Sequence, residues 1–430
     1  MLLEFKLANF GCFPDEQTLS LVASSDKTLP SHMISRDGQA TALKGALIYG
    51  PNGGGKSTVV RALARFREIV LNSARVSVDR PLMVEPFKLD KARSQAPSTF
   101  AATFVHRGIR HEYGFSADRS QIHEEWLFAW PNGRLQKWFE RRGNRFTFGS
   151  GLKGEKNCLA RFTRENCLFL SIATLHNHEQ LRDVSTWFSE KLIVAESRWL
   201  EGAEILESAG ARIFGQLVHV NRVAKDAALK KRLTQLLAGA DLGISGIDLE
   251  QRDWAPGELS PIEGMSQEEA MESLKGLGID GPTQVFTRHR TSDGVDIRLS
   301  LSEESLGSQQ LFHLAPLLFD AQDKEATLVV DEIFPHLHPV LTERILADFF
   351  RSAGGGQLIT TTHDMSLLNQ DLVRRDQVWM VEKSAQGEAR LFSLADFSPR
   401  KDTVISKGYQ MGRYGGVPIV GDLGLRHSHA

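Results

Sequence analysis

The chain has 430 residues, with 51 Lys and Arg, 53 Asp and Glu, and a formal net charge of −2. Hydrophobic residues make up 41% of it and charged residues 24%, an ordinary composition for a globular protein with a buried core. The near-neutral charge excludes a strongly basic nucleic-acid coat protein and an acidic-tailed protein. Length alone predicts two or three domains' worth of chain.

Membrane, secreted and disulfide-rich classes are also disfavoured. No apolar run approaches the roughly 18 residues that a membrane span needs. The opening MLLEFKLANF lacks the basic and then apolar pattern of a signal peptide. Cys12, Cys158 and Cys167 form no C-x-x-C pair, so we expect neither a disulfide framework nor a zinc site. We therefore expect a cytoplasmic protein.

The most specific motif is a glycine-rich loop after a short apolar strand over 46–49. Its residues are Gly50, Pro51, Asn52, Gly53, Gly54, Gly55, Lys56, Ser57 and Thr58. This is a complete phosphate-binding loop, and the helical spacing of Val59, Leu63, Phe66 and Val70 supplies the expected following helix. A glycine-rich turn with an incidental lysine is the alternative, which the flanking strand and helix disfavour.

Residues of this loop are all expected to contact ATP. Glycines let successive amides point at phosphate oxygens, and the new helix adds its positive N-terminal end. We expect Lys56 to reach the β- and γ-phosphates and the Ser57 hydroxyl to ligate Mg²⁺.

Two later strand ends supply the remaining candidates for this site. T-L-V-V-D-E over 327–332 is typical of a Walker B strand, in which Asp331 holds Mg²⁺ and Glu332 activates the attacking water. A second strand over 357–362 ends at His363, where ABC-type ATPases place a histidine against the γ-phosphate. A helix over about 340–352 fits between them. The alternatives are an exposed acid pair and a structural histidine.

The segment before Walker B is a candidate signature motif that departs from the LSGGQ spelling of ABC proteins. Ser305 and Gly307 precede an apolar helix pattern, and the amides and dipole of that helix would cap a γ-phosphate held by another subunit. Ordinary helix capping is the alternative. We interpret His336 and His338 as loop or dimer-contact residues rather than metal ligands. Gln95 is a positional candidate for a Q-loop.

We expect an α/β fold: a P-loop ABC-type ATPase core, with a mixed sheet and flanking helices, an antiparallel β subdomain and a helical insertion. Alternation over 98–150 and around Asp293-Gly294 predicts antiparallel strands and hairpins; spacing predicts helices within 165–240, and composition a loop over 251–282. The expected divisions are 1–160 (N-terminal half of the core with the P-loop), 161–283 (helical insertion or lid), 284–400 (C-terminal half with signature, Walker B and His363) and 401–430 (extension for partner contact).

With these motifs the chain resembles the ABC-type AAA-family ATPases of bacterial anti-phage and abortive-infection systems. RloA and AbiL-type proteins are nearest, with the PARIS ATPase AriA and the Septu ATPase as relatives. The resemblance is carried by the opening F-K-L-A-N-F-G-C-F, the strand-rich F-A-A-T-F, the E-S-L-G signature and the ending K-G-Y-Q-M-G-R-Y-G-G-V-P. It implies ATP hydrolysis with Mg²⁺ by at least an ATP-sandwich dimer, in which Ser305 and Gly307 act in trans.

The resemblance also implies a separate effector, such as a Toprim-type nuclease or an RloB-like protein, and a DNA or phage-protein trigger. We expect the effector in a partner because the chain after His363 is too short for a Toprim domain. A RecF-like repair or recombination ATPase is the alternative, distinguished by salt-dependent DNA binding. The ATP subunit of a transporter ranks third because the signature diverges, and we expect no membrane partner.

Overall fold

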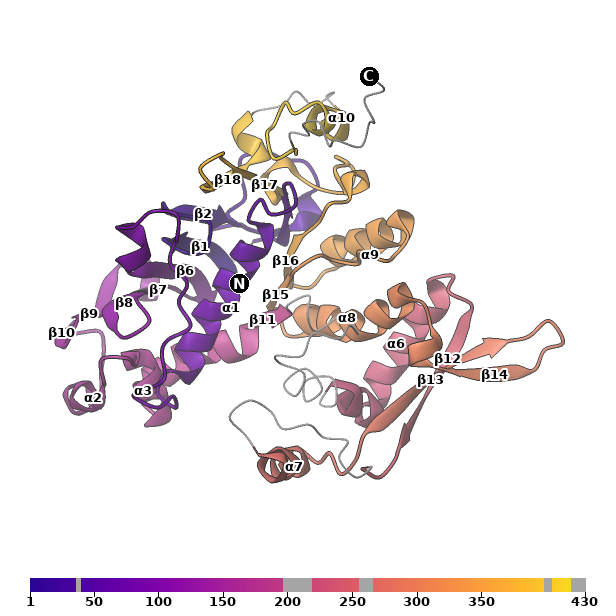
Figure 1. Ribbon diagram of the computed structural model, residues 1–430, viewed down its shortest axis with the longest axis horizontal. Coiled ribbons are helices and arrows are strands. Elements are labelled where there is room, and N and C mark those ends of the chain that lie inside the picture. Colours follow the sequence, from indigo (N-terminus) through magenta and orange to yellow (C-terminus); the bar gives the residue numbers. More distant parts are fainter. Residues whose placement is uncertain (36–39, 196–218, 255–265, 398–403, 419–430) are drawn as a thin grey trace, which may run out of the picture. The chain divides into compact units, whose positions relative to one another are not determined.

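Figure 1 shows the computed structural model, which describes residues 1–35, 40–195, 219–254, 266–397 and 404–418. The chain forms two compact units. The first unit consists of residues 1–194, 321–333 and 345–430, and the second of residues 195–320 and 334–344. The second unit is therefore inserted into the chain of the first.

The first unit contains a seven-stranded antiparallel sheet in the order β10-β9-β8-β7-β6-β1-β2. Its strands are β1 (Leu2–Ala8), β2 (Gln17–Ser20), β6 (Ser98–His106), β7 (Ile109–Ala117), β8 (Ile122–Trp130), β9 (Gln136–Arg142) and β10 (Arg145–Phe148). Strands β6 to β10 follow one another as antiparallel neighbours, which confirms the expectation for 98–150. A short pair, β3 (Met33–Ile34) and β4 (Ala42–Leu43), lies apart from this sheet.

The second sheet of this unit has the order β11-β15-β16-β5-β17-β18. Its strands are β5 (Gly45–Tyr49), β11 (Leu192–Ala195), β15 (Thr327–Val330), β16 (Gln357–Thr361), β17 (Val378–Lys383) and β18 (Ala389–Ser393). Strands β15, β16, β5 and β17 run parallel, and β18 is antiparallel to β17. The sheet is therefore mixed, and the loops after its parallel strands emerge at one edge.

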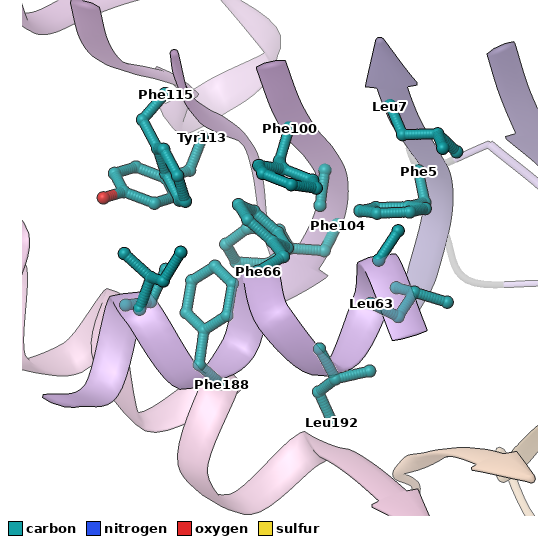
Figure 2. Packing of buried hydrophobic residues seen from close by; sticks show 14 of the residues in the cluster. Phe5, Leu7, Leu63, Phe66, Phe100, Phe104, Tyr113, Phe115, Phe188 and Leu192 are labelled. Carbon is teal, nitrogen blue, oxygen red and sulfur yellow. The ribbon is translucent and has the colours of Figure 1, made fainter. Parts of the chain in front are cut away.

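Helix α1 (Lys56–Asn72) contributes the centre of the core that joins these sheets. The predicted face of Val59, Leu63, Phe66 and Val70 is fully buried. Figure 2 shows Phe66 surrounded by side chains of β1, β6 and β7 and by Phe188, whose ring centroid lies 5.3 Å away. The same core cluster includes Val329 and Ile359 of the mixed sheet, so the P-loop helix packs against both sheets.

The remaining helices of the first unit are short. Among the described residues they include α2 (Lys156–Phe162), α3 (Phe169–Leu175), α4 (Glu179–Thr186), the π-helical η4 (Trp187–Lys191) and α10 (Ile405–Gln410), besides several one-turn 3-10 helices. Helix α9 (Pro339–Arg351) fills the helix expected over 340–352, and most of it belongs to this unit. Within the expected helical stretch 165–240, β11 interrupts the helices and residues 196–218 lie outside the described residues.

The second unit combines a three-stranded antiparallel sheet with helices. Its described elements include β12 (Ile244–Gln251), β13 (Thr283–Arg290), β14 (Asp296–Ser300), α6 (Ala227–Gly239), α7 (Gln267–Gly276) and most of α8 (Leu306–Asp323), with a helical stretch over 219–225 and the 3-10 helix η6 (Leu301–Glu303). The predicted hairpin is β13–β14. The loop expected over 251–282 is wrong for 267–276, because Ser266 and Glu269 form a capping box that starts α7. No described helix is long and apolar enough to cross a membrane.

A buried carboxylate ties α3 to the antiparallel sheet. Glu125 on β8 accepts hydrogen bonds from the Tyr113 hydroxyl at 2.9 Å and from the Phe169 and Leu170 amides at 2.7 and 3.0 Å. Its other partner is Arg141, 3.6 Å away, and both side chains are fully buried. The carboxyl group thus sits at the N-terminal end of α3, where unpaired amides favour an anion. Burial raises the pKa of Glu125, and Arg141 and these amides oppose that shift.

We expect Glu125→Ala to destabilise the protein by about 3–5 kcal/mol, because it leaves Arg141 buried without its carboxylate. Glu124→Ala is the matched control. Glu124 is the preceding residue of the same strand and pairs with Arg142 in solvent, so its loss should cost at most about 0.5 kcal/mol. Guanidinium unfolding followed by tryptophan fluorescence measures both, and equal midpoints for the two variants would contradict this assignment.

Candidate nucleotide site

The site lies where three neighbouring parallel strands end. Strand β16 pairs with β15 on one side and with β5 on the other. The P-loop follows β5, Asp331 and Glu332 follow β15, and His363 follows β16 shortly after its last residue. The sheet therefore brings together segments that are far apart in the sequence, at the edge where open parallel sheets bind their ligands.

The P-loop backbone requires glycine at its ends. Gly50, Gly53 and Gly55 have φ of 156°, 70° and 118°. A Cβ on Gly50 would lie 2.6 Å from the Val381 carbonyl oxygen, and one on Gly55 would lie 2.7 Å from the Cys12 sulfur. The loop can therefore follow this path only without side chains at these positions.

Lys56 is the first residue of α1 and is 5% exposed. Its ammonium group donates to the carbonyl oxygens of Gly50 at 2.9 Å and Pro51 at 3.2 Å. Burial lowers the pKa of Lys56, and the Glu332 and Asp331 carboxylates partly oppose this shift, so all three charges belong to one electrostatic site. The next residue, Ser57, is exposed in the first turn of α1.

Thr361 holds both acids of the Walker B segment. Its hydroxyl donates to Asp331 Oδ1 at 2.7 Å and accepts from the Glu332 amide at 2.7 Å. Its carbonyl accepts from the Ile333 amide at 3.2 Å. These contacts fix Glu332 in a left-handed conformation with φ of 54°, which is uncommon for a residue with a side chain and typical of functional sites.

His363 faces Glu332 across the same edge. Its Nε2 lies 3.6 Å from Glu332 Oε1, and about two fifths of each side chain is exposed. Burial and then the Lys56 charge lower the pKa of His363, against the opposing effect of the two carboxylates. The imidazole is therefore neutral near pH 7 and keeps one ring N–H for donation.

A cavity of about 360 Å³ opens beside the P-loop. Of the predicted binding residues, Pro51 and residues 53–58 line it. The sequence analysis missed its other walls: Gly11, Cys12, Arg61, residues 85–89, Lys383 and Gly387. Gly11 and Cys12 belong to the opening F-K-L-A-N-F-G-C-F, which was the one available signal. Gln95, the Q-loop candidate, lies in the short η2 (Arg93–Gln95) and lines a neighbouring cavity.

These residues fit Mg²⁺ and a nucleoside triphosphate. The loop is a cradle of glycines and an ammonium group, which suits phosphate oxygens. The Ser57 hydroxyl and the Asp331 carboxylate are the hard oxygen donors that Mg²⁺ prefers. Ser57 would hold the ion from the P-loop and Asp331 from the end of β15.

The signature candidates lie in the second unit, at the start of α8. The Ser305 hydroxyl accepts from the Ser308 amide at 3.2 Å, which is the capping role considered as the alternative. A Cβ on Gly307 would lie 2.7 Å from the His336 carbonyl oxygen, so α8 begins in close contact with the loop at 336–337. The preceding Glu304 bonds His289 at 2.6 Å and fixes this turn to β13.

The loop of the second unit that contains His336 and His338 also makes a structural hydrogen bond. His338 accepts from the Val340 amide through Nδ1 at 3.3 Å, at the start of α9. This bond satisfies one of the unpaired amides of the first turn of α9.

The solved structures similar to this chain include SMC head domains. One is "Crystal structure of the SmcHead bound to the C-winged helix domain of ScpA", with 13% identity, a TM-score of 0.47 and coverage of 91% of this chain and 97% of that chain. The SMC head domain from Thermotoga maritima has 14% identity, a TM-score of 0.39 and coverage of 91% and 98%. A third is the Smc head domain with an extended coiled coil, bound to the C-terminal domain of ScpA and derived from Pyrococcus furiosus. It has 13% identity, a TM-score of 0.39 and coverage of 96% of this chain and 98% of that chain.

No curated protein matches the sequence. A family profile does match residues 46–369, a span that begins in β5, ends after His363 and covers about three quarters of the chain. The chain therefore belongs to the family described as "AAA domain, putative AbiEii toxin, Type IV TA system".

Proposed function

We propose that this chain binds ATP with Mg²⁺, hydrolyses it, and through its nucleotide state controls a separate effector, a nuclease or toxin, in bacterial anti-phage defence. The observation that carries the ATPase part is the meeting of Lys56, Asp331, Glu332 and His363 at one sheet edge. These residues supply a phosphate cation, a metal carboxylate, a base and a neutral hydrogen-bond donor, which is the set that phosphoryl transfer to water requires.

Each residue has a separate task in this proposal. Lys56 turns from the loop carbonyls to the β- and γ-phosphates. Ser57 and Asp331 would hold Mg²⁺, which would offset phosphate charge when bound. Glu332 accepts a proton from water as the water oxygen bonds to the γ-phosphorus and the bond to the bridging oxygen breaks. His363 orients the γ-phosphate through its ring N–H. The products are ADP and inorganic phosphate.

A second copy of the chain would complete the site. Ser305 is exposed at the head of α8, where its hydroxyl caps the Ser308 amide, and Gly307 behind it is buried. In this proposal the Ser305 hydroxyl would turn from that amide to a γ-phosphate bound by another protomer, at the positive end of the helix. ATP would then hold two copies together and hydrolysis would release them, which gives the nucleotide a two-state assembly to bias.

The defence part of the proposal is supported by the description of the family, which names a toxin and a type IV toxin–antitoxin system. An ATPase in such a system needs a toxic activity to control. We place that activity in a partner of the Toprim-nuclease or RloB-like kind, with DNA or a phage protein as the trigger.

Glu332→Gln should keep ATP binding and lose turnover. The amide retains the size and the backbone contact to Thr361 but cannot take the proton, and loss of a general base costs about 10²–10⁴-fold in kcat. Phosphate release measures turnover, and fluorescent-nucleotide titration measures affinity. Sedimentation should show the variant accumulating as a dimer with ATP.

Two surface substitutions in the Glu332→Gln background test whether Ser305 takes part in the ATP-dependent dimer. Ser305→Arg should abolish the ATP-dependent dimer, because a long cation would occupy the position proposed for the partner's γ-phosphate. Ser302→Arg, with an equally exposed serine three residues earlier, should leave it intact. An unchanged dimer in both variants would remove the signature from the proposal, and normal turnover by Glu332→Gln would remove Glu332 as the base.

Thr361→Val should slow hydrolysis by about 10–100-fold and change the Kd for ATP by less than about threefold. Valine keeps the volume but removes the hydroxyl that fixes both acids. Thr361→Ser should recover most of the rate. Thr327→Val is the matched control, because the Thr327 hydroxyl is also buried and bonds Gln357 at the opposite end of the same strand pair. A Thr361→Ser variant as slow as Thr361→Val would argue against positioning by this hydroxyl.

Phage should form plaques less efficiently on cells that carry the gene with its flanking genes. Lys56→Ala should restore the plaque count, because it removes the cation that binds phosphate. Deleting the flanking effector gene should restore it equally. Protection that survives Lys56→Ala would refute nucleotide control. Salt-dependent, ATP-dependent binding of purified protein to gapped DNA, without protection, would favour the RecF-like alternative.

A further inference from the structure

The ending K-G-Y-Q-M-G-R-Y-G-G-V-P folds back onto the strands that carry the nucleotide site. Within it, α10 is followed by a turn in which the Tyr409 hydroxyl donates to the Gly416 carbonyl at 2.7 Å. A Cβ on Gly408 would lie 2.7 Å from the Tyr414 ring, and Gly415 and Gly416 both have φ of 66°. The glycines and tyrosines of this motif therefore serve one compact fold of residues 405–416.

This C-terminal fold reaches the strand before the P-loop. The Tyr409 ring meets the edge of the Tyr49 ring, with centroids 5.8 Å apart and planes at 67°. Tyr49 is fully buried and is the last residue of β5, directly before Gly50. An edge-to-face contact of this kind adds about 0.5–1.5 kcal/mol to the burial of the rings.

Tyr49 in turn holds the loop that carries His363. Its hydroxyl donates to the carbonyl of Asp364 at 3.0 Å. That loop is braced within itself: the Asp364 amide donates to the Thr362 hydroxyl at 3.0 Å, and the Asp364 carboxylate accepts from the Ser366 amide at 2.8 Å. A displacement of the Asp364 carbonyl would therefore move the loop and His363 together.

The C-terminal segment contacts the His363 loop through Tyr49 rather than by direct packing. Residues 365–366 and 368–370 of the His363 loop and residues 404–406 at the start of α10 line a cavity of about 380 Å³, so these two segments do not pack closely at that level. The connected path is Tyr409 to the Tyr49 ring, and the Tyr49 hydroxyl to the Asp364 carbonyl.

We propose that Tyr409 and Tyr49 are positioning residues of the nucleotide site, through which the C-terminal segment sets the position of His363. This inference rests on the proposed ATP hydrolysis. The site is therefore sensitive to any change that breaks this ring contact, because the Tyr409 ring supports the Tyr49 side chain whose hydroxyl holds the Asp364 carbonyl.

Tyr409→Ala and Tyr49→Phe test the two steps in the full-length chain. Both should lower kcat about tenfold and change the Kd for ATP by less than about threefold, since the P-loop itself is untouched. Tyr409→Phe keeps the ring and should stay within about twofold of wild type. Hydrogen exchange at amides 362–368 should quicken in Tyr409→Ala and Tyr49→Phe alone.

Phe397→Ala is the control for general damage to the C-terminal segment. Phe397 packs on Tyr414 and Phe392 and is about half exposed, so its loss should loosen the segment and leave kcat within about twofold. Rates near wild type in Tyr409→Ala and Tyr49→Phe would overturn the inference. So would equal rate losses in Phe397→Ala, or an affinity loss as large as the rate loss. If the wild-type protein does not hydrolyse ATP, the proposed function fails, and the exchange at 362–368 alone decides this inference.

Discussion

The nucleotide site depends on the close approach of β5 and β16. A Cβ on Gly45 would lie 1.9 Å from the carbonyl oxygen of Leu358, so no side chain fits at this position. The pairing of Leu358 with Gly45 sets the register of every later pair, up to Thr361 beside Ile48. Because β15 pairs with the other side of β16, this one register places the P-loop, the two acids and His363 at a common edge.

At the end of β15, Glu332 has a strained backbone conformation, and hydrogen bonds to Thr361 offset the cost of that strain. A left-handed residue other than glycine costs about 1–3 kcal/mol. At Glu332 the cost is offset by the bond from its own amide to Thr361 and by the Ile333 amide on the Thr361 carbonyl. Since Thr361 is buried, its hydroxyl holds the Asp331 carboxylate and the Glu332 backbone before any ligand arrives, which is the preorganisation that the proposed phosphoryl transfer would use.

Much of the frame could be predicted from the sequence because it depends on short-range pattern. The P-loop context, the strands over 98–150 and the β13–β14 hairpin each follow from spacing within a few residues. Helix α7 was missed because Gly, Ser and Pro around it resemble a loop, although Ser266 and Glu269 spell its capping box. The opening motif marked Cys12 as notable, but its place beside the P-loop is set by tertiary packing and does not follow from spacing.

The same limit explains why the roles of Thr361 and Glu125 could not be predicted from motifs. Thr361 lies in a run of three threonines, and Glu125 alternates along β8 like any strand residue, so neither stands out by type or spacing. What distinguishes them is burial together with a polar partner distant in sequence.

Tyr49 and Thr361 share one further property, since each is the last residue of its strand. Their hydroxyls face the loops that follow the sheet, while their backbones remain in its ladder. Because both backbones are paired in the sheet, each hydroxyl is held by the sheet at the point where a loop begins. The loop after β15 and the loop after β16 are therefore held by hydroxyls at strand ends, namely those of Thr361 and Tyr49. Tyr409 acts on the second of these loops through its contact with the Tyr49 ring.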